Sequence, residues 1–245
     1  MTMIQRFNKL TVLSFLIWIV FFYAGNAIAT VRPIADNGLL TNRISGATIP
    51  FIKNTGQINE NVGFYAKTFG GTLFVTRDGK LVYSLPVKHH LLSREIGTAI
   101  NNKTSIYVLR EQLLGSNEIS PKGEDKVETK INYFIGKDIT KWKTGIDSFR
   151  KISFGEVYTN VNLDLKAYGN NIEKIFTIKP QGDVDNIRIG IKGASIAIGP
   201  TGELEINTRL GLVKFTAPVA YQDIAGQRKY VKAAYVCLLY TSDAA

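Results

Sequence analysis

The stretch EVYTNVNLDLKAYGNNIEKIFTIKP, residues 156–180, predicts two β-strands joined by a tight turn. Apolar and polar residues alternate from 161 to 166, which is the period of a strand with one buried face. The loop is expected at Gly169, Asn170 and Asn171, because these residues tolerate the positive φ angles of a hairpin. We therefore expect this hairpin to be the element around which the fold is built.

Similar short apolar runs lie on both sides of this hairpin. Asp78 and Gly79 separate two of them and give the strongest hairpin signal in the chain. The helical signals are short, one at 111–114 and one that starts at Asp138. Strand runs at this spacing, with Gly-rich turns between them, predict an all-β, antiparallel β-sandwich for residues 51–236. It is expected either as one body or as two sheet-rich lobes, residues 51–126 and 127–236.

The N-terminus has the three parts of a secretory signal peptide. Arg6 and Lys9 precede the apolar run 10–23, and the small residues of Ala27-Ile28-Ala29 follow it. We expect a signal-peptide helix over residues 1–29, cut after Ala29, and therefore a secreted or cell-surface protein that meets the membrane only during export. An uncleaved membrane anchor is the alternative, although the run is shorter than the ~20 residues of a spanning helix. Residues 30–50 are expected as an exposed lead-in.

Residues 237–245, CLLYTSDAA, correspond when back-translated to an adapter used in shotgun sequencing. We interpret them as a scar, and we expect the natural chain to continue beyond Val236. A native C-terminal strand is the alternative. Under the first interpretation residues 30–236 contain no cysteine, so the exported domain must be held by packing without disulfides.

The formal net charge of +10 raises the question of a nucleic-acid partner. Yet the cations are scattered singly, without a dense Lys/Arg run and without an RNA-binding signature of interleaved aromatics. The pattern favours a solvated surface and no nucleic acid. Weak attraction to anionic cell-envelope polymers stays open.

The sequence contains no recognisable catalytic motif, and we expect no cofactor and no metal site. His89 and His90 are the only histidines. Adjacent residues of a strand point to opposite faces, so the pair favours a loop at 88–103 over a metal site. A glycosidase needs two carboxylates ~5 to ~9 Å apart. If Tyr168 pairs with Ile172, the best candidates, Asp164 and Glu173, point to opposite faces and form no dyad.

Exposed aromatic side chains are the remaining candidates for binding. Trp142 is the one tryptophan outside the signal peptide, and we interpret it as a core residue in preference to a sugar-stacking platform. The candidate ligand contacts are Trp142, Tyr158, Tyr168 and Tyr221.

A succession of short motifs resembles the N-terminal domain of unknown function in bacterial SBBP-repeat (β-propeller-repeat) surface proteins. The resemblance covers residues 51–236, with Pro180-Gln181-Gly182 and the stretch 88–103 as departures from the pattern. It rests on Phe51, Asn54, Gly56, Gln57, Asn132-Tyr133-Phe134, Gly136, Trp142, Val157-Tyr158, Asp164-Leu165, Tyr168-Gly169, Glu173, Phe176, Pro218, Tyr221-Gln222 and Gly226. It implies an exported, multidomain bacterial protein with propeller repeats after Val236, and no established activity.

Two functions follow as expectations. The first is a non-catalytic cell-surface module that supports the downstream repeats and takes part in adhesion or envelope interaction, with cell-envelope polysaccharide as a partner. The second is an extracellular domain that binds or hydrolyses carbohydrate through the four aromatic residues.

Overall fold

The computed structural model describes residues 2–7, 15–23, 48–68, 70–86, 106–169, 171–209 and 211–238. The helical content of these residues is two single turns of 3₁₀-helix, η1 (Ile139–Lys141) and η2 (Val184–Asn186), and neither is long enough to cross a membrane. The strands are β1 (Thr2–Phe7), β2 (Phe15–Tyr23), β3 (Phe51–Lys53), β4 (Val62–Thr68), β5 (Gly71–Thr76), β6 (Leu81–Pro86), β7 (Ile106–Leu113), β8 (Lys122–Tyr133), β9 (Lys143–Tyr158), β10 (Val161–Tyr168), β11 (Asn171–Ile178), β12 (Arg188–Lys192), β13 (Ser195–Ile198), β14 (Leu204–Thr208), β15 (Gly211–Phe215), β16 (Val219–Ile224), β17 (Gln227–Val231) and β18 (Ala233–Leu238). All their pairings are antiparallel, which confirms the expected all-β, antiparallel class.

The hairpin of β10 and β11 lies near the centre of the sheet, as its sequence predicts. Alternate residues of β10 are buried along its whole length. The register is one residue away from the expected one, because Tyr168 lies opposite Asn171 and not opposite Ile172. The loop therefore consists of two residues, Gly169, with φ 48°, and Asn170, which lies outside the described residues.

The Asp78-Gly79 turn forms as expected between β5 and β6. The Gly79 amide donates to the Thr76 carbonyl at 3.1 Å, and Gly79 has φ 77°. A Cβ on Gly79 would also approach the Ile119 side chain to 2.5 Å, so both the backbone angle and the packing require glycine here.

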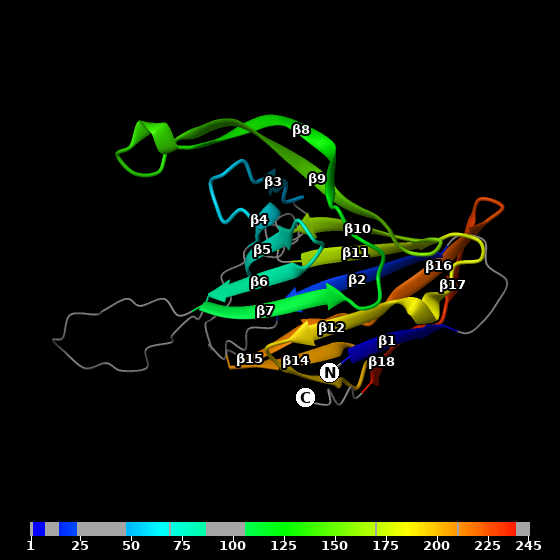
Figure 1. The fold of residues 1–245 in the computed structure, drawn as a ribbon. Helices are drawn as coiled ribbons and strands as arrows, with labels where there is room; N and C mark the ends of the chain where they lie inside the picture. Colours follow the sequence, from blue (N-terminus) through cyan, green and yellow to red (C-terminus); the bar gives the residue numbers. More distant parts are fainter. Residues whose placement is uncertain are drawn as a thin grey trace, which may run out of the picture.

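The paired strands follow one another around a strongly curled sheet (Figure 1). From β9 the pairing runs one way through β10 and β11 to β2, and the other way through β3, β4, β5, β6 and β7 to β12. β2 pairs with both β16 and β15. β15 pairs in turn with β14, and β14 pairs with β13. β1 joins β12 to β18, and β18 lies next to β13. The sheet thus curls back on itself around an interior.

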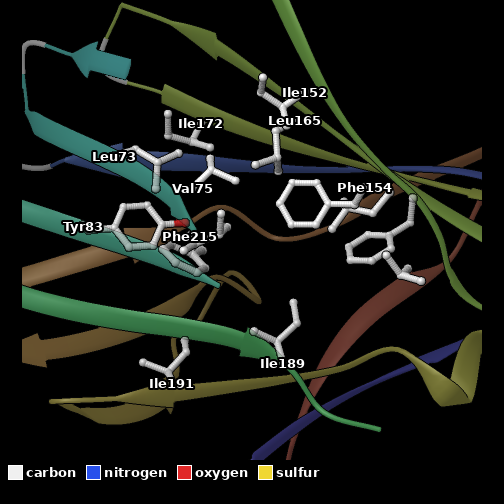
Figure 2. Packing of buried hydrophobic residues seen from close by; sticks show 14 of the residues in the cluster. Leu73, Val75, Tyr83, Ile152, Phe154, Leu165, Ile172, Ile189, Ile191 and Phe215 are labelled. Carbon is white, nitrogen blue, oxygen red and sulfur yellow. The ribbon is translucent and has the colours of Figure 1, made fainter. Parts of the chain in front are cut away.

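That interior holds one large apolar cluster to which both halves of the chain contribute (Figure 2). Residues before position 127 and residues after it pack against each other there. Its labelled members are Leu73, Val75, Tyr83, Ile152, Phe154, Leu165, Ile172, Ile189, Ile191 and Phe215. At roughly 1.5–3 kcal/mol for each fully buried aliphatic or Phe side chain, this cluster is the main source of the stability of the fold.

Strands β1 and β2 fall within the segment expected as a signal-peptide helix. β2 lies between β11 and β16, with Trp18 opposite Ile175 and Ile17 opposite Ala220 (Figure 1, the blue strand beside β11). Residues 2–7 and 15–23 thus form sheet strands in this structure, and the removal of residues 1–29 on export stays a prediction.

Several local features of the structure differ from those expected from the sequence. Residues 111–114 were expected as a helical turn, yet β7 runs through Leu113 because Glu111 points into the interior and is buried there. Strand β8 begins at Lys122, inside the polar stretch 116–125, and pairs with β9. Most of the lead-in, the stretch 88–103 with His89 and His90, and residues 239–245 lie outside the described part of the chain.

Candidate functional site

The long hairpin of β8 and β9 forms an arm that projects from the curled sheet past β3 and β4 (Figure 1). Its register shifts between Val127 and Ile131, and again before Tyr133, and such bulges increase the twist of a strand pair. At the base, Ile131 and Tyr133 pack against a small cluster formed by Ile146, Ile52 and Tyr65. None of residues 134–145 belongs to this cluster or to the main core. The outer part of the arm is therefore free to serve contacts outside the domain.

The end of the arm is a compact turn built around Asp138. As expected, Asp138 caps η1, since its carboxylate accepts from the Thr140 amide at 3.0 Å. Trp142 closes the turn, because its indole N–H donates to the Gly136 carbonyl at 3.2 Å. The rings of Trp142 and Phe134 meet edge to face, with centroids 5.1 Å apart. These contacts hold the tip in one conformation.

The side chains of the tip face solvent. Trp142 is 39% exposed, so the interpretation of this residue as part of the core is wrong. Three neighbouring apolar side chains are more exposed still, at 59–68%: Phe134, Ile135 and Ile139. Lys137 and Lys141 are exposed beside them, and Lys141 lies 3.6 Å from Asp138. Apolar side chains gathered on a projecting element mark a contact surface more often than scattered ones do.

The three candidate tyrosines lie on other elements and have other neighbours. Tyr158 is 5% exposed, and its hydroxyl lies 3.1 Å from the Leu114 carbonyl. Tyr221 is also 5% exposed, with the Arg228 guanidinium 3.7 Å from its ring centroid. Burial raises the pKa of Tyr158, and burial followed by the Glu173 charge raises the pKa of the half-buried Tyr168. Of the four aromatic candidates, Trp142 presents the most open ring.

The expected argument against an Asp164–Glu173 dyad is wrong in its geometry. With the observed register, Glu173 lies opposite Lys166 and Asp164 lies opposite Ile175, so both carboxylates point to the same face of the hairpin. Their surroundings differ, however. Asp164 pairs with Lys151 at 3.2 Å, whereas Glu173 is only 2% exposed and burial raises its pKa. A substrate has no access to a side chain as buried as that of Glu173.

A buried ion pair in the core was not foreseen from the sequence. The ammonium of Lys174 lies 2.8 Å from Oε2 of Glu111, and the Tyr83 hydroxyl donates to the same oxygen at 2.9 Å. Lys174 also lies 4.1 Å from the centroid of the Phe215 ring (Figure 2 shows Tyr83 beside Phe215). Burial lowers the pKa of Lys174 in spite of the Glu111 charge, and burial raises the pKa of Tyr83. Charges this deep act on stability, because solvent-borne molecules do not contact them.

A cationic cavity lies on the outer side of the sheet, where the Asp78-Gly79 turn meets β6, β7 and β12. Its volume is about 690 Å³. It is lined by Asn61, Thr76, Arg77, Asp78, Lys80, Val82, Arg110, Glu111, Gln112 and Lys192. Within the described residues no group of His, Cys, Asp and Glu has the arrangement of a metal site. In the part of the chain that the structure describes, the arm tip and this cavity are two surfaces whose composition suits binding.

Comparison with known proteins places the chain in a family. A family model with the description "Domain of unknown function (DUF7948)" matches residues 51–242. No curated protein and no solved structure matches the chain.

Proposed function

The chain belongs to the DUF7948 family, a family of domains of unknown function, and from this premise we propose that it is a non-catalytic binding module of the bacterial cell surface. The module has a sandwich-like body and makes its contacts through the tip of the β8–β9 arm. Adhesion, or attachment to other components of the envelope, is the activity that this arrangement serves.

The exposed apolar tip carries this proposal. Ile135 and Ile139 are about two-thirds exposed at the end of an element that adds nothing to the main core beyond its base. Exposed apolar surface at a projecting turn lowers the solubility of a protein. Such a surface is therefore expected where a binding partner covers it. The flanking Lys137 and Lys141 suit a partner that combines apolar surface with negative charge.

The cellular setting is part of the same proposal. Residues 1–29 direct export and are removed after Ala29, and propeller repeats follow the domain in the natural protein. The small-residue box Ala27-Ile28-Ala29 and the order of motifs shared with SBBP-repeat proteins support this setting. The N-terminus of the exported protein, read by mass spectrometry, is expected at Thr30. An exported protein that keeps residues 1–29 would contradict this part of the proposal.

The tip is tested by co-sedimentation of the purified chain with bacterial cell-envelope fragments. The double variant Ile135→Ser, Ile139→Ser is expected to bind about tenfold more weakly or worse, since each aliphatic side chain buried in a contact contributes of the order of 1.5 kcal/mol or more. The matched control is Ile198→Ser, Val219→Ser, which removes two exposed aliphatic side chains away from the arm. Equal binding by the tip variant and the unaltered chain would overturn the proposal.

Carbohydrate binding is the second candidate, favoured by the open ring of Trp142 in the same turn as the exposed carboxylate of Asp138. An aromatic face next to a polar group is a common way to hold a sugar ring. A glycan array probed with the chain and with Trp142→Ala separates the two candidates. Loss of dose-dependent glycan binding in Trp142→Ala, with an unchanged circular dichroism spectrum, would favour this second function over a protein or lipid contact.

A further inference from the structure

The cationic cavity contains two unpaired cations that face each other across neighbouring strands. Arg110 of β7 lies directly opposite Lys192 of β12, and on its other side opposite Val82 of β6. Both Arg110 and Lys192 are exposed, and neither makes an ion pair with any described residue. Like charges in directly opposed positions of a sheet are unfavourable. The sheet therefore carries an electrostatic cost here that a bound anion would remove.

The remaining charges do not neutralise the cavity. Lys80 pairs with Asp78 at 2.6 Å, and the two cancel. Arg77 donates its Nε to the Glu60 carbonyl at 2.7 Å, so it keeps its full positive charge. The carboxylate of Glu111 is held in the core by Lys174 and adds no negative charge to the outer face. Among the described residues, Arg77, Arg110 and Lys192 thus remain without a countercharge.

The neutral groups in the cavity match a polyhydroxylated ligand. Asn61 and Gln112 supply side-chain amide groups, and Val82 supplies a small apolar surface. A volume of about 690 Å³ accommodates a short oligomer rather than a single ion. The described lining residues include no aromatic side chain, whereas proteins that bind single-stranded nucleic acid stack the bases on aromatic rings.

We propose that this cavity binds a short stretch of an acidic polysaccharide. Its carboxylate or sulfate groups are held between Arg110 and Lys192, and its hydroxyl groups bond to Asn61 and Gln112. A guanidinium group forms paired hydrogen bonds with planar oxyanions, which gives Arg110 the leading part in recognition. The acidic polysaccharide is a partner of the surface module proposed above. Because it binds at a different surface from the arm tip, an experiment can refute one of the two proposals without refuting the other.

The test measures binding of defined oligosaccharides to the full chain by isothermal titration calorimetry. The probes are a heparin-derived octasaccharide, which carries sulfates and carboxylates, and oligogalacturonate of the same length, which carries carboxylates alone. Short oligothymidylate represents nucleic acid. The variant Arg110→Gln, Lys192→Gln is compared with Lys229→Gln, Lys232→Gln, which removes the same charge from exposed residues of β17 and the position after it. The tip variant Ile135→Ser, Ile139→Ser is measured beside them.

We expect at least one oligosaccharide to bind, and the cavity variant to weaken its affinity about tenfold or more. The Lys229, Lys232 control and the tip variant should bind as the unaltered chain does. Equal losses of affinity in the cavity variant and the charge control would show that net charge alone causes the effect. This result would overturn the proposal. Oligothymidylate binding that is tighter than either sugar and lost in the cavity variant would also overturn it, in favour of nucleic acid. Absence of binding to both oligosaccharides would refute it outright.

Discussion

The interior of the sheet holds apolar side chains from alternate strand positions and one buried ion pair, Lys174 with Glu111. The alternation in β10 predicts correctly that Leu163 and Leu165 are buried. The same reasoning places Lys174 on the surface with other charged residues, but its position on β11 makes it face the core and Glu111. Local sequence does not reveal such a pair, because its two members lie far apart in the chain and meet only once the sheet has curled. The buried pair therefore needed the structure.

The Lys174–Glu111 pair gives a prediction about stability. Lys174→Met removes the cation and leaves Glu111 buried without its countercharge, so the free energy of unfolding should fall by about 3–5 kcal/mol. The double variant Lys174→Met, Glu111→Leu removes both charges and should recover part of this loss. Urea denaturation followed by circular dichroism measures both. Lys229→Met, at an exposed lysine of β17 that makes no ion pair with any described residue, is the control and should change stability by less than about 1 kcal/mol.

The carboxylate of Glu203 gives a prediction about pH. Hydrogen bonds from Thr201, foremost its hydroxyl, and from Lys214 lower the pKa of Glu203 to about 2, against 4.5 for an unperturbed glutamate. Because the folded pKa is the lower one, the unfolded chain binds more protons between these two values. The contribution of Glu203 is therefore complete above about pH 4.5 and is lost as the pH falls towards 2.

Thermal unfolding of the chain and of Glu203→Gln over pH 2–6 measures this contribution. The unaltered chain should have the higher melting temperature at pH 6, and the difference should shrink as the pH falls. Melting curves that stay equally far apart at every pH would show that the carboxylate charge does not contribute.

At the scale of elements, turns and alternation determined what could be foreseen. The Asp78-Gly79 hairpin between β5 and β6 agrees with the sequence. The register of β10 and β11 differs from the expected one. Alternation predicts which residues of each strand face the core, whereas the length of the loop determines which residues of the two strands lie opposite each other. The observed loop has two residues where three were expected, and Glu173 therefore lies on the same face of the hairpin as Asp164. The length of β8 was missed because its solvated, charged residues have the composition of a loop.

The position of β2 gives a prediction at this scale. β2 is the shared neighbour of β11 and β16, so removal of residues 1–29 frees the backbone groups of both strands on that side. Unpaired backbone groups and an open sheet edge are unfavourable and favour association with another strand. We expect residues 30–245 alone to exchange the amide hydrogens of β11 and β16 faster than the whole chain does, whereas those of β4 and β5 keep their rates.

Hydrogen exchange read by mass spectrometry measures this difference. A synthetic peptide of residues 13–25, added to residues 30–245, should slow exchange in β11 and β16, and a peptide of the same composition in scrambled order should not. Protection of both strands in residues 30–245 alone would show that the sheet is stable without β2.

At the scale of the whole molecule, the curled-sheet body and the β8–β9 arm have different roles. The body holds the main apolar cluster, and the strands that enclose it come from both ends of the chain. The arm has its own small cluster at the base and an exposed tip. The sequence predicted the class of the body correctly but gave no sign of the arm, since the exposure of Phe134 and Ile139 depends on how far β8 and β9 extend together beyond the sheet (Figure 1).

This division predicts that the arm can be shortened without loss of the fold. Tyr133 and Lys143 lie directly opposite each other, so Asn-Gly can join them as a two-residue turn in place of residues 134–142, which leaves Tyr133 packed on the cluster at the base of the arm. The shortened chain should melt within about 4 °C of the unaltered one, because a change of less than 1 kcal/mol moves the midpoint of a domain of this size by no more than that. It should at the same time lose binding to cell-envelope fragments and keep the binding of acidic oligosaccharides by the cavity. A large fall in melting temperature would mean that the tip stabilises the body, and the exposed side chains would then need a structural explanation in place of a functional one.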